Sequence, residues 1–355
     1  MQKRIGMLDF IVVGAAQAGL AMAYYLRKQG KDFLVLDKES EIGASWLNRW
    51  DSLTLFTPSE FNNMPGMEFP AEKGHYPSKV EVAKYFKDYA EKFEFPIQLN
   101  TLVENIAHHD DHFVLRTSEG IMKARNVVIA TGPFHIPYTP PFSKKIDEDI
   151  FQIHSNYYKN PDQLKEGKAM VVGAGDSGFQ ILDEVSEENG RMVYFSGTTD
   201  VKVLPQEILG KTLWWWFTKS GFLSFSRDTW LGRKISKSRQ PVIGTDVKAI
   251  LERDNVEPVG KTKNAEGELV VTEKKKIKDL KNIIWATGYR PNFSWIEGLE
   301  LTKDGYPEHY RGVSNIEGLY FIGLPWLHTR GSATLGGIKK DAEYLADYIE
   351  KNVSN

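Results

Sequence analysis

The apolar residues near the start of the chain form two short runs that flank a longer run with helical spacing. Residues 9–13 are a short apolar run, and residues 18–29 repeat apolar positions at helical spacing until Gly30. Residues 33–36 form the second short run, which ends at Asp37. This pattern predicts a strand, a helix that stops at a glycine, and a second strand. That order is typical of a βαβ unit.

The same order of runs returns later in the chain. Residues 170–172 are apolar, residues 179–188 have helical spacing before Gly190, and residues 192–195 form a further apolar run. Two βαβ units in one chain predict an α/β fold with two Rossmann-like dinucleotide-binding domains of similar plan.

The remaining runs predict further elements. Residues 102–107 and 112–116 indicate a hairpin, and a closing helix is predicted at residues 333–351 because its apolar positions have helical spacing. Residues 133–141 contain four prolines and predict a linker without regular structure. The charged run 274–278 is expected at the solvated surface. Further buried strands are predicted at residues 127–130, 283–286 and 319–322.

Composition narrows the function classes. The chain has 355 residues, enough for two domains, and 45 basic residues balance 47 acidic ones, so no nucleic-acid partner is expected. There is no cysteine, which excludes a disulfide framework, a cysteine-ligated metal and a redox dithiol. No apolar run has the roughly 18 residues of a membrane span. The N-terminal apolar run includes Asp9 and Gln17, so we interpret it as a strand and loop and expect a cytoplasmic protein.

The first glycine-rich loop, at residues 14–19, has the sequence GAAQAG and lies between the first predicted strand and helix. Gly14 allows the tight turn, Gly19 allows close packing of the helix, and the amides at the helix start can hold a pyrophosphate. Ala16 takes the place of the usual middle glycine. Asp37 lies where a carboxylate accepts hydrogen bonds from ribose hydroxyls. The alternative is a glycine-containing turn in an unrelated α/β protein.

The second loop, at residues 173–178, has the complete sequence GAGDSG. Counting from Gly173 by the spacing between Gly14 and Asp37 leads to Ser196, so no acid follows the second strand. Without a carboxylate to repel a 2′-phosphate, and without an arginine at Gly197 or Thr198 to attract one, we expect poor discrimination between NADH and NADPH. The alternative is a degenerate copy that binds nothing.

Further motifs sharpen this interpretation. ATG occurs at residues 130–132 and again at 286–288, GASW lies at 43–46, and YFIG precedes the last helix at 320–323. With LFTP at 55–58 and SATL at 332–335, this ensemble resembles the flavin-containing monooxygenase and Baeyer–Villiger (class B flavoprotein monooxygenase) superfamily of two-dinucleotide-binding-domain flavoproteins. It is most similar to the small bacterial single-component members.

The resemblance implies a nicotinamide domain inserted in an FAD domain. Residues 1–134 and 286–355 would bind FAD, and residues 135–285 would bind NAD(P), with an aromatic-rich insert near residues 205–245. The start of a helix at residues 332–335 would lie near the isoalloxazine and stabilise its negative charge. The implied FAD contacts are Gly14, Ala16, Gln17, Gly19, Asp37, Lys38, Gly43, Trp46, Val103, Thr131, Gly132, Gly323, Ser332, Ala333, Thr334 and Leu335. The implied NAD(P) contacts are Gly173, Gly175, Asp176, Ser177, Gly178, Ser196, Gly197, Thr198, Ala286, Thr287 and Gly288.

The activity implied by the resemblance is an FAD-dependent, NAD(P)H-using monooxygenation of small soft nucleophiles or ketones through a flavin 4a-peroxide. Its partners would be a small-molecule substrate and molecular oxygen, and a homodimer is left open. The family fingerprint has phenylalanine and glycine where this chain has Glu148 and Ile150, before His154. That departure motivates one alternative, an NAD(P)H oxidase or diaphorase. A flavoprotein accessory to a cation transporter is another alternative.

Several polar and aromatic features carry competing interpretations. Residues 213–230 hold seven aromatic residues. They fit a lid or inserted helix packed on the nicotinamide domain, the mouth of an apolar channel or, least favoured, a helix at the membrane interface. Residues 108–112 (HHDDH) are interpreted as a polar turn, and no metal is expected. Arg49 and His154 are the candidate catalytic residues: Arg49 orients the cofactor or peroxide or forms a surface salt bridge, and His154 acts as an acid or caps a turn.

Overall fold

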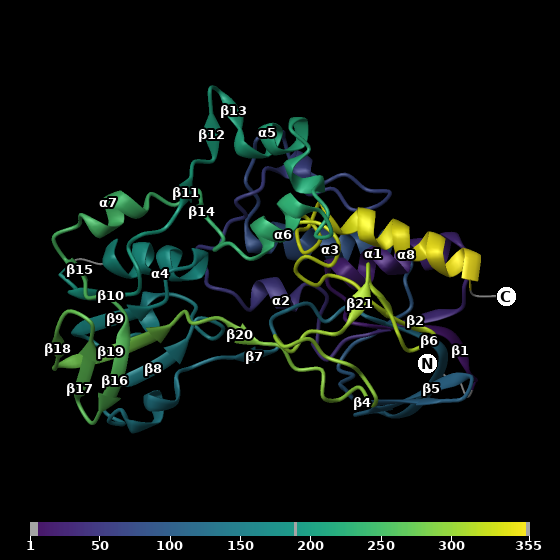
Figure 1. The fold of residues 1–355 in the computed structure, drawn as a ribbon, viewed down its shortest axis with the longest axis horizontal. Helices are drawn as coiled ribbons and strands as arrows, with labels where there is room; N and C mark the ends of the chain where they lie inside the picture. Colours follow the sequence, from purple (N-terminus) through teal and green to yellow (C-terminus); the bar gives the residue numbers. More distant parts are fainter. Residues whose placement is uncertain (1–5, 188–189, 353–355) are drawn as a thin grey trace.

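The computed structural model describes residues 6–187 and 190–352, whose strands form two main sheets and several small ones (Figure 1). The first is a 9-stranded sheet with the order β21-β22-β23-β6-β1-β2-β3, and the hairpin of β4 and β5 pairs with the start of β6. The pairs β1–β2, β1–β6, β2–β3 and β6–β23 are parallel. Its strands are β1 (Leu8–Val13), β2 (Phe33–Leu36), β3 (Ile97–Gln98), β4 (Val103–His109), β5 (His112–Thr117), β6 (Gly120–Ile129), β21 (His309–Tyr310), β22 (Val313–Ser314) and β23 (Leu319–Phe321).

Strand β1 shows why this sheet is buried on both faces. Phe10 and Val12 point into one apolar core, and Ile11 and Val13 point into another on the opposite face. A strand covered on both sides is expected to be apolar throughout rather than alternating. Helices α1 (Gln17–Lys28), α3 (Lys79–Lys92) and α8 (Ile338–Asn352) contribute to the first core. We call this sheet with its helices the first unit; it also holds α2 (Ala44–Leu47) and η1 (Ser59–Phe61).

The second unit is built on a 5-stranded sheet with the order β15-β10-β9-β19-β8, in which every pairing is parallel. Helices α4 and α7 contribute side chains to the core on one face, and a small three-stranded sheet covers the other. Its elements are η2 (Pro141–Lys145), β8 (Phe151–His154), η3 (Pro161–Gln163), β9 (Lys168–Val172), α4 (Asp176–Glu187), β10 (Val193–Ser196), α7 (Val247–Leu251), β15 (Val256–Pro258), β16 (Thr262–Glu266), β17 (Leu269–Thr272), β18 (Lys276–Ile277) and β19 (Leu280–Trp285).

The chain crosses between the units as a two-stranded antiparallel ribbon. Strand β7 (Ile136–Pro137), in the segment predicted to lack regular structure, pairs with β20 (Tyr289–Arg290) (Figure 1). The prediction of an unstructured linker was therefore wrong here. Local proline content cannot indicate a partner strand that lies about 150 residues along the chain.

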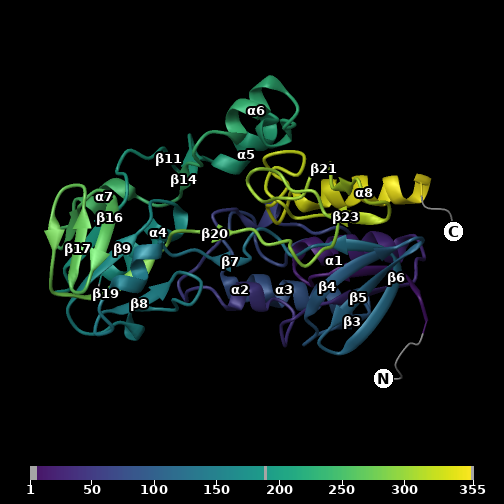
Figure 2. The same ribbon diagram turned by 60° about the horizontal axis from the view of Figure 1, so that its bottom comes forward.

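An insert at residues 203–243 rises from the second unit and reaches over the first (Figures 1 and 2). Its base is the parallel pair β11 and β14, and its aromatic segment forms two short helices separated by Gly221, whose φ is 69°. Trp214 stacks on Phe56 and donates to its carbonyl at 2.8 Å, so the interpretation as a lid on the nicotinamide domain was wrong. The elements are β11 (Val203–Leu204), β12 (Glu207–Ile208), β13 (Lys211–Thr212), α5 (Leu213–Lys219), η4 (Phe222–Ser224), α6 (Trp230–Ser236) and β14 (Val242–Ile243).

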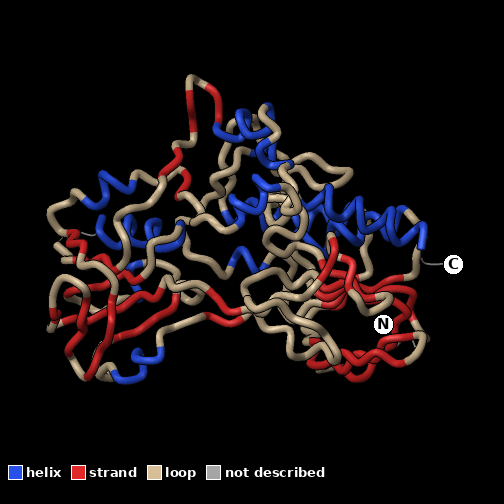
Figure 3. Tube along the Cα trace, viewed as in Figure 1, coloured by secondary structure: helices blue, strands red, loops and turns tan. Residues whose placement is uncertain are grey.

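The predicted secondary structure fits best where the pattern is local (Figure 3). The strand at residues 33–36 and the helix after the first glycine loop are confirmed. The predicted end of the helix at Glu188 lies outside the described residues.

No helix within residues 6–187 and 190–352 is long and apolar enough to span a membrane. In the same ranges, no cluster of three or more His, Cys, Asp or Glu could bind a metal ion.

Candidate cofactor sites

The first glycine loop makes a turn that needs glycine at both ends. Gly14 has φ of 111°, and a Cβ there would lie 2.7 Å from the carbonyl oxygen of Ala130. A Cβ on Gly19 would lie 1.8 Å from the carbonyl oxygen of Gly14, so the start of α1 can approach the loop only without a side chain. The loop therefore has the geometry predicted for a dinucleotide-binding turn.

The start of α1 is available to an anion. Its N-cap residue is Ala16, whose methyl side chain cannot accept hydrogen bonds from the first amides of the helix. Asp37 lies beside the loop, where its carboxylate accepts hydrogen bonds from the Ala15 amide at 2.6 Å and the Glu39 amide at 2.9 Å. Free helix amides next to a fixed carboxylate are the donor and acceptor set that fit the pyrophosphate and ribose of FAD.

The carboxyl ends of three neighbouring parallel strands meet at this loop. The Ala130 amide donates to the Val13 carbonyl at 2.8 Å, and the Ile322 amide donates to the Ile129 carbonyl at 3.0 Å. Gly323 follows directly, and a Cβ there would lie 2.7 Å from the Cβ of Ala18. Residues predicted from three distant motifs are therefore brought together at one edge of the sheet, where α/β folds bind their ligands.

Side chains around the loop connect the other predicted FAD residues. Trp46 donates from Nε1 to Oε1 of Gln17 at 3.3 Å. Thr131 shares a 3.1 Å hydrogen bond with His135, a residue that sequence reasoning missed. Burial lowers the pKa of His135, so the ring is neutral near pH 7.

Four other predicted FAD residues lie in different surroundings. A Cβ on Gly43 would lie 2.7 Å from Cα of Ala83, so this glycine allows α2 to approach α3. Val103 is buried in the core beneath the sheet, together with Val13. Lys38 is exposed and lies 3.8 Å from the carboxylate of Glu39. Gly132 has φ of 69° and faces open space.

The predicted helix start at residues 332–335 was wrong. Residues 331–337 form turns, and α8 begins at Ile338. Ser332 is buried, and its Oγ accepts the amides of His328 and Thr329 at 3.1 and 3.0 Å. Gly336 and Gly337 explain why α8 starts later than predicted. A Cβ on Gly336 would lie 1.7 Å from the Phe61 carbonyl oxygen, and a Cβ on Gly337 would lie 2.1 Å from the Gly331 carbonyl oxygen. Ala333, Thr334 and Leu335 are thus in a packed loop rather than a helix.

The second glycine loop has the same two steric constraints and one difference. A Cβ on Gly173 would lie 2.1 Å from the Ala286 carbonyl, and a Cβ on Gly178 would lie 2.1 Å from the Gly173 carbonyl. A Cβ on Gly175 would meet no atom within 4 Å. Gly175 therefore leaves a space in front of the start of α4. The phosphates of a nicotinamide dinucleotide fit such a space.

The structure shifts the position equivalent to Asp37 by one residue. The Gly14 amide donates to the carbonyl of Leu36, and the Gly173 amide donates to that of Ser196. The residue after Ser196, Gly197, is therefore the counterpart of Asp37, and our assignment to Ser196 was wrong. Ser196 is 1% exposed, and its Oγ accepts the Thr262 amide at 2.9 Å. Thr198, next along the chain, accepts the amide of Asp200.

The insert reaches the second loop. The carboxylate of Asp176, the first residue of α4, accepts the Ile243 amide at 3.2 Å, and Arg239 donates to the Ala174 carbonyl at 2.8 Å. Burial raises the pKa of Asp176, and Arg330 of the first unit lowers it in part. Sequence reasoning missed Arg239 and Arg330, because both are distant in the chain from the glycines they approach. Ser177, beside Asp176, is half-buried.

The second ATG motif is held by hydrogen bonds from neighbouring strands. The Ala286 amide donates to the Val172 carbonyl at 2.8 Å, and Thr287 donates to the Tyr138 carbonyl. Buried His154 donates from Nε2 to the Gly288 carbonyl at 3.0 Å and accepts the Asn156 amide on Nδ1 at 3.0 Å. Burial lowers the pKa of His154. Both ring nitrogens are engaged, so this geometry supports a positioning role rather than an acid.

Arg49 lies where the two units meet. It donates to the hydroxyl of Tyr289 at 2.7 Å, and its guanidinium lies 5.0 Å from the ring centre of Phe134. The Tyr289 hydroxyl donates in turn to Asn156 at 3.0 Å. Among residues 6–187 and 190–352, Arg49 therefore forms no salt bridge; it is part of a hydrogen-bonded chain that joins the segment after α2 to the segment after the second ATG motif.

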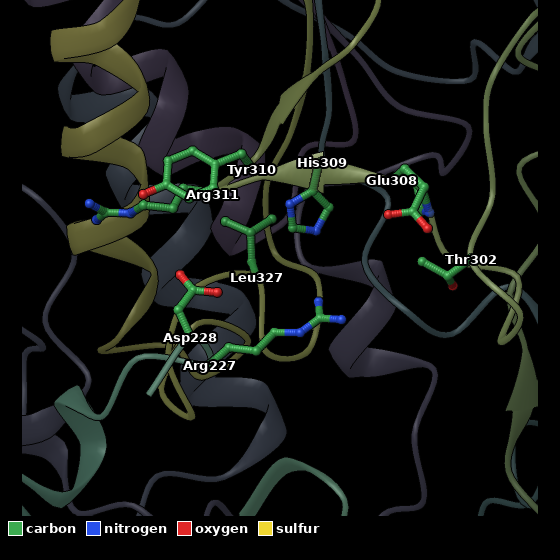
Figure 4. Close-up of a pocket in the computed structure, with 9 residues that line it drawn as sticks. Arg227, Asp228, Thr302, Glu308, His309, Tyr310, Arg311 and Leu327 are labelled. Atoms are coloured by element: carbon green, nitrogen blue, oxygen red, sulfur yellow. The ribbon is translucent and has the colours of Figure 1, made fainter. Parts of the chain in front are cut away.

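A polar cavity of about 220 Å³ lies between the insert and the edge strand β21 (Figure 4). None of the residues predicted for either cofactor lines it. Burial lowers the pKa of His309 in its wall to about 4, helped by the nearby charge of Arg227. The lining residues are Arg227, Asp228, Thr302, Pro307, Glu308, His309, Tyr310, Arg311 and Leu327.

Comparisons with known proteins show which proteins this chain is similar to. The model of the pyridine nucleotide-disulphide oxidoreductase family matches residues 11–207. An uncharacterized CzcO-like oxidoreductase of Geobacillus kaustophilus is 44% identical over 96% of this chain and 98% of its own. The probable indole-3-pyruvate monooxygenase YUCCA3 of Arabidopsis thaliana is 28% identical over 88% of this chain and 81% of its own.

Solved structures give the same fold. The flavin-containing monooxygenase from Stenotrophomonas maltophilia superposes with a TM-score of 0.81 at 24% identity, covering 99% of this chain and 100% of the other. The cyclohexanone monooxygenase from Rhodococcus superposes with a TM-score of 0.71 at 17% identity, covering 98% and 85%. The predicted α/β fold class with two dinucleotide-binding domains is confirmed.

Proposed function

The chain belongs to the pyridine nucleotide-disulphide oxidoreductase family, and from this premise we propose that it is an FAD-dependent, NAD(P)H-using monooxygenase that oxygenates small soft nucleophiles or ketones. Relatives and structural neighbours named as flavin monooxygenases support the general class. The choice of substrate class is the finer part of the proposal, and it rests on the resemblance in the sequence.

One observation carries the proposal: two glycine loops lie at the carboxyl ends of the parallel strands in two sheets, in a chain that has no cysteine. When bound, FAD takes a hydride from the reduced nicotinamide and passes the electrons to an acceptor. Members that reduce disulfides pass electrons through a cysteine pair, which this chain lacks. Molecular oxygen or another small acceptor is the remaining partner.

The residues of the first loop would hold FAD. The free amides at the start of α1 would neutralise the pyrophosphate, and Asp37 would accept from the ribose hydroxyls. Gln17 and Trp46, which hydrogen-bond to each other, extend this surface. The side chain of Arg49, fixed by Tyr289 and Phe134, would present a positive charge between the two units.

The residues of the second loop would hold the nicotinamide cofactor. Gly175 leaves room for the pyrophosphate, while Gly197 and Thr198 offer neither a carboxylate nor a cation to a 2′-phosphate. Acceptance of both NADH and NADPH is therefore part of the proposal. His154 would keep the Gly288 turn in place beside the loop without exchanging a proton, because both of its nitrogens are already bonded.

The coupling ratio tests the proposal. The FAD-loaded protein is incubated in air with NADPH or NADH, with and without methyl phenyl sulfide, and sulfoxide and hydrogen peroxide are counted per nicotinamide oxidised. Sulfoxide as the main product is expected. Peroxide in amounts equal to the nicotinamide oxidised, unchanged by the sulfide or by a ketone in its place, would contradict monooxygenation.

A second candidate function, an NAD(P)H oxidase or diaphorase, is favoured by one specific observation. The fingerprint positions before His154 hold exposed Glu148 and Ile150, which is 5% exposed and packed in the apolar core of the second unit. The coupling experiment separates the two functions, since the second predicts nicotinamide oxidation with peroxide or a reduced quinone as the product.

A further inference from the structure

Arg330 reaches from the first unit toward the second. It lies on the loop between β23 and α8, whose neighbours His328 and Thr329 pair with the insert through the Arg227 amide and a bridge to Ser226. Its guanidinium donates to the side chain of Gln240 at 2.6 Å. Gln240 follows Arg239, which bonds the Ala174 carbonyl of the second glycine loop. The contacts of the insert thus bring Arg330 to that loop.

The second glycine loop lacks a cation of its own. The sequence from Gly173 to Thr198 carries five acidic residues and one arginine, Arg191. Arg191 donates to the carbonyls of Lys165 and Gly167, so its charge is used away from the loop. A dinucleotide pyrophosphate carries two negative charges, and it would meet Asp176 at the start of α4. The acidic residues are Asp176, Asp183, Glu184, Glu187 and Glu188.

The positive charge of Arg330 is available for an anion. Among the described residues, no carboxylate lies within ion-pair distance of it, and its partners are the neutral amide of Gln240 and the ring of Phe222 at 5.7 Å. It also interacts electrostatically with Asp176. Arg239 differs, because its guanidinium already supports the loop by bonding the Ala174 carbonyl.

We propose that Arg330 is the phosphate-binding cation of the nicotinamide site, so that the pyrophosphate bridges the second glycine loop and a loop of the first unit. The inference rests on the proposed function, which supplies the dinucleotide. Arg330 acts on the pyrophosphate rather than on a 2′-phosphate. It interacts with Asp176 at the start of α4, whereas a 2′-phosphate belongs beside Gly197 and Thr198. NADH and NADPH therefore depend on it equally.

Binding of ADP-ribose, NADP⁺ and NAD⁺ to the FAD-loaded protein tests the proposal by calorimetry, with no turnover needed. Arg330→Gln is expected to weaken all three by roughly ten- to a hundredfold, the loss of one charge-assisted phosphate contact. Arg330→Lys should restore part of the affinity. Arg125→Gln, which removes an exposed arginine paired with Asp9, is the matched control and should leave binding unchanged.

Steady-state kinetics add a second readout. Arg330→Gln is expected to raise KM for both nicotinamides while kcat and the visible absorbance of bound FAD stay within about twofold. Equal binding by wild type and Arg330→Gln would overturn the inference alone. A loss confined to NADPH and NADP⁺ would also overturn it, by assigning the arginine to the 2′-phosphate. Failure of the wild type to bind any of the three probes would overturn the proposed function as well.

Discussion

The two glycine loops share a backbone plan but are completed in different ways. In the first, the acid that follows the second strand, Asp37, bonds the Ala15 amide of its own loop. In the second, Gly197 takes that position, and the contacts come from Ile243 and Arg239 of the insert. In its acid–amide contact the first loop is therefore self-contained within one βαβ unit, whereas the corresponding contacts of the second loop come from distant parts of the chain.

This difference indicates how each cofactor would be held. A self-contained loop suits a cofactor that stays bound through many turnovers. A loop assembled from several segments suits a cofactor that enters and leaves, because movement of any one segment changes its affinity. Substitutions at the two loops can test this contrast.

Gly19→Ala should have the largest effect. The added Cβ would lie 1.8 Å from the Gly14 carbonyl, so α1 must move away from the loop. We expect loss of FAD from the purified protein and a fall in the free energy of unfolding of about 3 kcal/mol or more. Absorbance near the flavin band and chemical denaturation measure the two effects. Retention of FAD with normal stability would show that the loop is less rigid than its geometry indicates.

Asp37→Asn should weaken FAD without unfolding the protein. The asparagine still offers an oxygen to the Ala15 amide, but it loses the charge that strengthens bonds to ribose hydroxyls. A decrease in FAD affinity of roughly tenfold or more is expected from titration of the apoprotein. Nicotinamide binding should not change, and a parallel loss at both sites would contradict the independence of the first loop.

Gly175→Ala should separate binding from stability at the second loop. Its Cβ meets no atom within 4 Å, so the free energy of unfolding should change by less than about 1 kcal/mol. The methyl group occupies the space in front of α4, and NADH and NADPH affinity should both fall roughly tenfold. Gly178→Ala is the comparison variant, since its Cβ would lie 2.1 Å from the Gly173 carbonyl and should also destabilise the unit.

Thr198→Arg should introduce the discrimination that the second loop lacks. A guanidinium beside Gly197 can pair with a 2′-phosphate. We expect kcat/KM for NADPH over NADH to rise by about tenfold, measured with both cofactors under identical conditions. Thr198→Gln, of similar length but without charge, serves as the control. An unchanged ratio would mean that the 2′-position lies elsewhere.

Asp176 should give the second loop a pH dependence that is absent from its asparagine variant. Burial raises the pKa of this carboxyl, so it takes up a proton at a higher pH than an exposed aspartate. Protonation removes repulsion of the pyrophosphate, and ADP-ribose affinity should rise about two- to fivefold as the pH is lowered from above to below the raised pKa of Asp176. The contribution of Asp176 to the free energy of unfolding likewise increases as pH falls through its raised pKa. An equal rise in Asp176→Asn would assign the effect to another group.

Local patterns predicted the parts of the fold that depend on local forces. The strand Phe33–Leu36 and the glycine turns follow from buried apolar runs and steric limits close to them in the sequence. The counterpart of Asp37 was misplaced by one residue, because the stretch from the glycine loop to the end of the following strand is one residue longer in the second unit than in the first. Spacing alone cannot reveal such a difference.

Parts of the site that depend on tertiary packing could not be predicted. The helix expected at residue 333 begins instead at Ile338, because Gly336 packs directly on the Phe61 carbonyl. Arg330 approaches Asp176 only after the insert has folded across both units. No sequence feature near Arg330 or Asp176 predicts that the two side chains interact.

The discontinuous first unit also sets an order for folding during synthesis. The strands of the second sheet lie between residues 151 and 285, so that unit can complete its sheet while the ribosome is still adding the rest of the chain. Strand β6 must wait for β23, and the apolar face of α1 must wait for Ile338, Ala342 and Leu345 of α8. Until α8 emerges from the ribosome, this face is exposed and open to aggregation. A nascent chain that stalls before α8 therefore presents an uncovered apolar face that chaperones bind.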